Sequence, residues 1–77
     1  MTLGGEWVPR KIRQLKADML KAGCVWRPAK GSHTVWGHPL IEDTITLSGN
    51  DGADAKEYQE KEVRGLIAKA RKAQQNP

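Results

Sequence analysis

Apolar residues recur with helical spacing in the first third of the chain. Counted from Ile12, they fall at i, i+3, i+7 and i+8, which places them on one stripe of a helix. Pro9 suits the first turn because its missing N–H needs no partner there, and Gly23 is a stop signal. The pattern predicts a helix over residues 9–22 whose core-facing stripe consists of Ile12, Leu15, Met19 and Leu20.

Strand-like patterns occupy the middle of the chain. The segments CVWRPAK and SHTVWGH lie on either side of Gly31, which favours an antiparallel hairpin, and Pro28 restricts the first strand to an edge or irregular position. The segment DTITLS, residues 43–48, alternates polar and apolar positions and predicts a third strand with Ile45 and Leu47 on its buried face. The following GNDGADA is dense in turn formers and predicts a loop.

A second helical pattern ends the chain. Acidic residues precede its apolar stripe and Lys and Arg follow it, the order that complements a helix dipole. The pattern predicts a helix from near Glu57 to about Lys72, with Gly65 where something packs closely and the final QQNP frayed. Its stripe consists of Val63, Leu66, Ile67 and Ala70.

The order of elements predicts a small α+β fold. A helix, three antiparallel strands and a second helix form a two-layer sandwich when both helices cover one face of the sheet. The 77 residues fit a single domain over 1–77, with flexible tails at about 1–8 and 73–77. No apolar run approaches the roughly 20 residues that span a bilayer, and the N-terminus lacks signal-peptide regions. We therefore expect a cytoplasmic protein without a membrane partner.

The cysteine content limits the possible chemistry. Cys24 is the single cysteine, so no internal disulfide and no thiolate-rich metal site can form. Cys24 is either a reactive thiol or, as we expect, a small buried apolar residue after the first helix. We expect neither a metal nor a small-molecule cofactor.

The charge pattern indicates an anionic partner. The formal net charge of +4 comes from 13 Lys and Arg against 9 Asp and Glu, with basic ends and an acidic middle. A clustered positive surface attracts phosphate backbones or acidic proteins without specifying either, and an ordinary solvated helix face is the alternative.

One run of the chain carries a recognisable motif. Residues 11–39, KIRQLKADMLKAGCVWRPAKGSHTVWGHP, resemble the HicA family of toxin–antitoxin mRNA interferases. EVRGLIAKA is similar to the C-terminal helix of that family. The chain departs from the family where the acidic SGNDGADAKEYQEKE replaces a Pro-His and lysine-bearing loop, and where Cys24 replaces an aromatic residue. The matching positions are Ala22-Gly23, Lys30, Gly31-Ser32-His33, Trp36 and His38-Pro39.

The resemblance implies a fold, an activity and a partner. The fold is similar to the double-stranded RNA-binding domain, the activity is ribosome-independent mRNA cleavage, and a HicB-like antitoxin protein inhibits it. His33 corresponds to the catalytic histidine. RNA supplies its own 2′-OH nucleophile, so a histidine near neutral pKa can act as general base or acid without a metal.

The remaining expected site residues surround His33 or lie on the basic face of the first helix. Cations stabilise the phosphate as charge builds up, a serine orients the backbone or substrate, and a glycine permits close approach. These RNA-binding residues are Lys30, Gly31, Ser32, Arg27, Arg10 and Arg13.

A second histidine and three tryptophans offer further roles. Positions 33 and 38 differ by an odd number, so the two histidines lie on opposite faces of a regular strand unless it bulges at Gly37. We interpret His38 as a turn residue before Pro39. The tryptophans can stack on RNA bases, but Trp26 or Trp36 is expected to be mostly buried, and Trp7 is the best interface anchor.

Two alternatives to a ribonuclease remain open on the sequence. One is a non-catalytic module that binds structured RNA by shape and phosphate contacts. The other is an interaction protein whose acidic middle and basic ends dock a partner.

Overall fold

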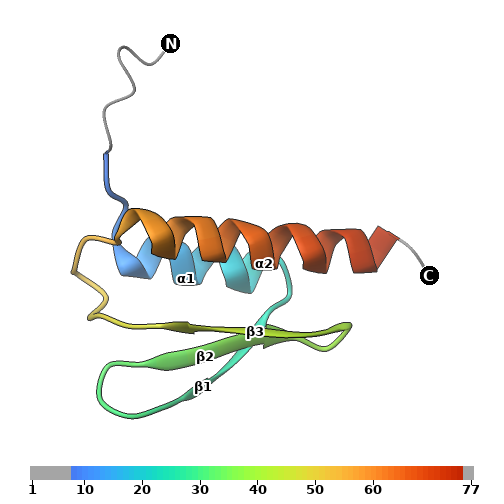
Figure 1. Cartoon of the computed structure of the whole chain (residues 1–77), viewed down its shortest axis with the longest axis horizontal. Helices are drawn as coiled ribbons and strands as arrows, with labels where there is room; N and C mark the ends of the chain where they lie inside the picture. Colours follow the sequence, from blue (N-terminus) through green and yellow to red (C-terminus); the bar gives the residue numbers. More distant parts are fainter. Residues whose placement is uncertain (1–7, 76–77) are drawn as a thin grey trace.

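The computed structural model describes residues 8–75 and confirms the α+β order. The elements are α1 (Ile12–Lys21), β1 (Val25–Pro28), β2 (Thr34–His38), β3 (Ile41–Leu47) and α2 (Glu57–Gln75). Both helices lie on one side of the sheet, so the molecule has two layers (Figure 1). Within the described residues, no helix is both long and apolar enough to cross a membrane.

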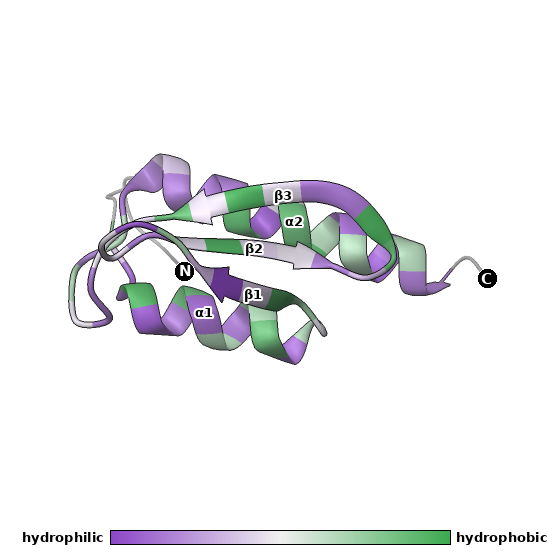
Figure 2. Cartoon of the chain, turned by 90° about the horizontal axis from the view of Figure 1, so that it is seen from below, coloured by the Kyte–Doolittle hydropathy of each residue, from purple (hydrophilic) through white to green (hydrophobic). Residues whose placement is uncertain are grey.

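The three strands form one antiparallel sheet in the order β1-β2-β3. Trp36 is central: it pairs with Trp26 on one side and with Ile45 on the other. The strand β1 is therefore an edge, as Pro28 predicted, and it borders α1 when the sheet is viewed from below (Figure 2). Side chains of β2 alternate between the helix-facing core and the open face of the sheet.

The core lies between the sheet and the two helices. The predicted stripes of both helices reach it, with one exception. Leu20 is 55% exposed, because it follows Met19 by one residue and lies beside the gap between α1 and β1. The largest fully buried side chains are Trp36, Ile12, Leu15, Met19, Leu47 and Val63.

The helix α1 begins three residues later than its sequence pattern predicted. Residues 9–11 are not helical, and Lys11 has extended dihedral angles and bridges Asp54. The first N–H groups of a helix lack acceptors within the helix. Here the loop after β3 supplies them: Ile12 N–H donates to the carbonyl of Ala53 at 2.9 Å and Arg13 N–H to that of Asp51 at 3.1 Å. This loop, and not Pro9, determines where the helix starts.

The helix α2 extends beyond its predicted end. Gln74 and Gln75 are helical, and the Gln74 side-chain amide donates to the carbonyl of Ala22 at 3.1 Å, so the expected fraying does not begin at residue 74. The expectation of close packing at Gly65 is wrong, because a Cβ built there would meet no atom within 4 Å. Trp7, the expected interface anchor, lies outside the described residues.

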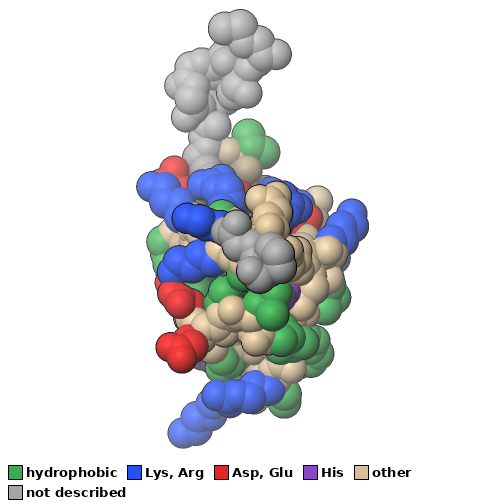
Figure 3. Space-filling view, turned by 90° about the vertical axis from the view of Figure 1, so that its right-hand side faces the viewer, with side chains coloured by type: hydrophobic (Ala, Val, Ile, Leu, Met, Phe, Trp, Pro, Cys, Tyr) green, Lys and Arg blue, Asp and Glu red, His purple; other side chains and the backbone are tan. Residues whose placement is uncertain are grey.

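Basic side chains are concentrated on the helix layer of the surface. On the face that carries the end of α2, lysine and arginine gather over the helix layer, hydrophobic side chains lie over the sheet layer, and further basic side chains lie at the lower end, beyond the sheet (Figure 3). Lys21, Arg64 and Arg71 line a groove between the helices, together with Asp18. We call this the helix groove.

Candidate functional site

The turn between β1 and β2 holds the Gly-Ser-His motif. It is closed by two backbone hydrogen bonds, from Ala29 N–H to the carbonyl of His33 at 2.9 Å and from His33 N–H to that of Lys30 at 3.1 Å. Gly31 has φ +63, in the left-handed region that glycine adopts without strain. The turn therefore presents His33 in a defined conformation at the end of the hairpin.

The His33 imidazole is exposed and has one oriented nitrogen. Its Nδ1 lies 2.9 Å from the carbonyl oxygen of Lys30. A carbonyl only accepts hydrogen bonds, so we assign the proton of the neutral ring to Nδ1. That tautomer leaves the lone pair of Nε2 available to accept a proton from a ligand.

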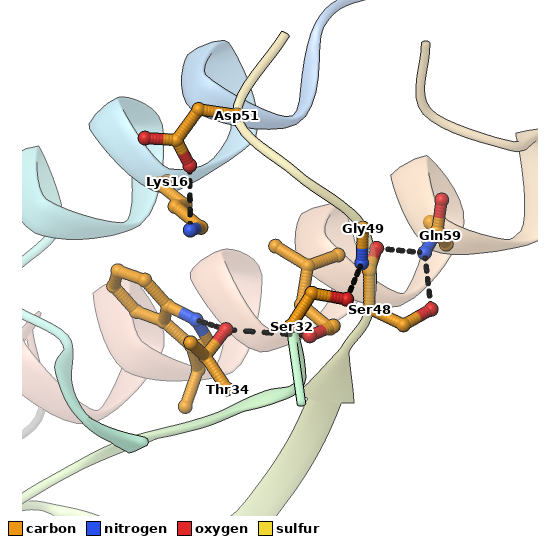
Figure 4. Close-up of polar contacts among 9 residues, drawn as sticks. Lys16, Ser32, Thr34, Ser48, Gly49, Asp51 and Gln59 are labelled. Atoms are coloured by element: carbon orange, nitrogen blue, oxygen red, sulfur yellow. Dashed lines mark hydrogen bonds and ion pairs between the residues drawn. The ribbon is translucent and has the colours of Figure 1, made fainter. Parts of the chain in front are cut away.

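Two long-range contacts involve the loop after β3, one with this turn and one with α1 (Figure 4). The Ser32 hydroxyl accepts a hydrogen bond from Gly49 N–H at 3.2 Å, at the start of the loop after β3. From α1, the Lys16 ammonium pairs with Asp51 of the same loop at 2.7 Å. His33, Ser32, Lys16 and Asp51 line one cleft of about 390 Å³, which we call the His33 cleft.

The charges around the His33 cleft are partly balanced. The acidic loop that departs from the HicA pattern pairs with α1 through Asp51 and Lys16, and with Lys11, just before α1, through Asp54 at 2.6 Å. Exposed ion pairs of this kind contribute only about 0–1 kcal/mol, so a phosphate can compete for the lysine. Lys16 and Asp51 were not among the predicted site residues. Asp51 belongs to the acidic replacement loop, which was the sequence signal for that residue.

The structure brings some of the predicted site residues together and separates others. Gly31, Ser32 and His33 line the His33 cleft, and the carbonyl of Lys30 orients His33. Arg13 lines a neighbouring cleft that shares Lys16 and Asp51 with this one.

Arg10 and Arg27 lie elsewhere. The Arg10 side chain pairs with Asp18, and that hydrogen bond raises the pKa of the arginine. Arg27 is exposed on β1 and lines a groove with Val25 and Val35 of the open face of the sheet. Their contact with RNA stays a prediction.

His38 does not form a catalytic pair with His33. The pairing of β2 with β3 does shift between Trp36 and His38, which is the irregularity at Gly37 that such a pair required. His38 is nevertheless 8% exposed, at the other end of β2, where its Nδ1 accepts from Leu40 N–H at 3.1 Å and its Nε2 lies 3.0 Å from the Gln74 amide. It is a buried structural residue and not merely a turn residue before Pro39.

Cys24 is buried, as expected for a structural residue. It is 5% exposed, and this burial raises the pKa of its thiol. A raised pKa lowers the thiolate fraction and therefore the reactivity. In the part of the chain that the structure describes, no group of three or more His, Cys, Asp or Glu is placed to hold a metal ion.

Comparison of the chain with protein families, curated proteins and solved structures finds no significant match. The exposed imidazole of His33 lies in the His33 cleft with Ser32, Lys16 and Asp51.

Proposed function

We propose that this protein is an endoribonuclease of the HicA type, the toxin of a toxin–antitoxin pair. It cleaves mRNA in the cytoplasm without a metal, and a HicB-like antitoxin inhibits it by covering His33. The observation that carries the proposal is the exposed His33 ring, whose Nδ1 lies 2.9 Å from the Lys30 carbonyl oxygen. The tautomer assigned from this contact leaves Nε2 as the base.

The chemistry follows from the 2′-OH of RNA. Nε2 of His33 removes the proton of the 2′-OH, a bond forms between that oxygen and the adjacent phosphorus, and the bond from phosphorus to the 5′-oxygen breaks. The leaving oxygen takes a proton from the imidazolium or from water. The products are a 2′,3′-cyclic phosphate and a 5′-hydroxyl. General base catalysis of this kind contributes about 10²–10⁴ in rate.

Neighbouring side chains can stabilise the phosphate as its charge grows. The Ser32 hydroxyl accepts from Gly49, which leaves its own proton for a phosphate oxygen. Lys16 lines the same cleft, and Lys30 belongs to the same turn. Charge-assisted hydrogen bonds from such groups are the usual means of stabilising developing anions.

The test is cleavage by the His33→Ala variant. Wild-type protein is expected to cleave single-stranded RNA in the presence of a chelator and to leave 2′,3′-cyclic phosphate ends, and the variant to lose at least about 100-fold of the rate. His33 is exposed, so the variant keeps its far-ultraviolet spectrum and its urea midpoint. His33→Gln is the matched polar control, because an amide has hydrogen-bonding groups but cannot act as a base near neutral pH.

Two outcomes would contradict the proposal. Equal cleavage by wild type and His33→Ala would exclude His33 as the base. No cleavage by either protein would favour the first alternative named above, a non-catalytic RNA-binding module. That alternative has one observation in its favour, the cationic helix groove of Lys21, Arg64 and Arg71, which shares no lining residue with the His33 cleft.

A further inference from the structure

A second cleft adjoins the His33 cleft and is not explained by the proposed chemistry. It lies between α1 and the edge strand β1, has a volume of about 340 Å³, and is lined by Trp26, Trp36 and Leu20 among others. It is open because β1 is an edge strand and neither Leu20 nor Trp26 is covered. We call it the tryptophan cleft.

Trp26 is a half-exposed aromatic residue on a rigid support. It is 52% exposed, whereas Trp36 beneath it is 1% exposed, and the two rings stack with centroids 5.9 Å apart and planes 23° apart. The indole N–H of Trp36 donates to the Thr34 hydroxyl at 2.8 Å, and that hydroxyl donates to the carbonyl of Leu47 at 3.3 Å (Figure 4). The Trp36 ring on which Trp26 stacks is therefore held in place before a ligand binds, which lowers the entropic cost of binding.

Two cations share the tryptophan cleft with these rings. Arg13 and Lys16 both line it. Within residues 8–75, Lys16 forms a salt bridge with Asp51, whereas no salt bridge involves the Arg13 side chain. A flat aromatic surface beside a guanidinium suits a ligand that is planar and also carries negative charge. A nucleotide has both properties, with a planar base and an attached phosphate.

The two clefts are adjacent. Lys16 and Asp51 line both, with Trp26 in the tryptophan cleft and His33 in the His33 cleft. An aromatic cleft beside a cleft for phosphate matches the layout of a nucleotide, in which the base projects from the backbone that carries the phosphate.

We propose that the tryptophan cleft receives an unpaired nucleobase of the RNA, stacked on Trp26, while the neighbouring phosphate lies in the His33 cleft. This inference deepens the proposed function and rests on it for the identity of the ligand. It names the substrate class as single-stranded RNA, because a base inside a duplex is stacked and paired and cannot enter the cleft. Arg13 contacts the base or the phosphate next to it.

The test measures binding and not cleavage. An eight-nucleotide 2′-O-methyl RNA lacks the nucleophile, so the protein can bind it but cannot cleave it. Titrated into the Trp7→Phe protein, it is expected to quench the fluorescence of Trp26. Against the same probe, Trp26→Ala should weaken binding by roughly 5- to 150-fold, the usual effect of losing one stacked base. Trp26→Phe, which keeps an aromatic ring, should retain most of the affinity.

Controls separate this inference from the proposed function. Val25→Ala removes a 56% exposed side chain from the same strand and should change binding by less than about twofold. A duplex of the same sequence should bind Trp26→Ala and wild type alike. If Trp26→Ala binds the single strand as tightly as wild type, or wild type does not bind it, the inference is overturned, even if His33→Ala still loses cleavage. If binding depends on Trp26 but no variant cleaves RNA, the inference stands and the ribonuclease does not.

Discussion

Replacing Gly49 by alanine is expected to destabilise the fold and disturb the His33 turn together. Gly49 has φ +112, a conformation that L-residues rarely adopt, and such strain costs about 1–3 kcal/mol. A Cβ at this position would lie 3.3 Å from Cγ1 of Ile12, whose side chain is 1% exposed and has little room to retreat. Adding the overpacking, we expect a loss of about 2–4 kcal/mol in the free energy of unfolding.

The same substitution at Gly65 is the matched control and should have the opposite sign. Gly65 lies inside α2, and a Cβ there would meet nothing within 4 Å. Alanine has a higher helix propensity than glycine, so Gly65→Ala should stabilise the protein by about 0.5–1 kcal/mol. Both values matter in a domain of this size, whose total stability is expected to be about 4–12 kcal/mol.

Urea unfolding and thermal unfolding, both followed by tryptophan fluorescence, measure both variants. Trp36 is buried and reports global unfolding. For a small domain, 1 kcal/mol corresponds to a shift of about 4–8 °C in Tm, so Gly49→Ala should melt at least about 8 °C below wild type. The N–H of Gly49 donates to Ser32, so this variant should also cleave RNA more slowly. A Gly49→Ala protein within about 0.5 kcal/mol of wild type, or a Gly65→Ala protein less stable than wild type, would refute the reasoning.

The other two predictions concern the acidic loop and the cysteine. Asp51→Asn removes the partner of Lys16 and one negative charge from the His33 cleft, so it should tighten binding of single-stranded RNA by a few-fold at low salt, with the gain shrinking as salt rises. Unchanged affinity, measured by fluorescence anisotropy at two salt concentrations, would place the phosphate elsewhere. The buried Cys24 thiol has a raised pKa, so it should react with a thiol reagent at pH 8 far more slowly than in urea. Equal rates in the two conditions would mean that the thiol is accessible in the folded state.

The arrangement of the acidic loop explains why some site residues were missed. Asp51 and Asp54 lie more than 30 positions after the lysines with which they pair. In the sequence they read as part of an acidic middle segment, with no sign that they face α1 and the residue before it. Only the return of the chain after β3 places them there, where the same loop also supplies carbonyl acceptors to the first turn of α1.

Trp26 illustrates a second limit of prediction from the sequence. Its pairing with Trp36 across the hairpin places both indoles on one side of the sheet. Their burial differs because β2 is central and β1 is an edge, and α1 does not cover that edge. Hydrophobic periodicity shows which side of a strand faces the core, but not how far the core extends over it.

By itself, the sequence of this protein determined the kind, order and approximate extent of its five elements, and the glycine turn that carries His33. These properties depend on local periodicity, on turn residues and on proline and glycine, whose effects act within a few positions. Only the tertiary structure decided the start of α1, the pairing of Lys16 with Asp51 and the two adjacent clefts. Each of these arises from contacts between segments that are distant in the chain, and such contacts depend on how the helices pack on the sheet.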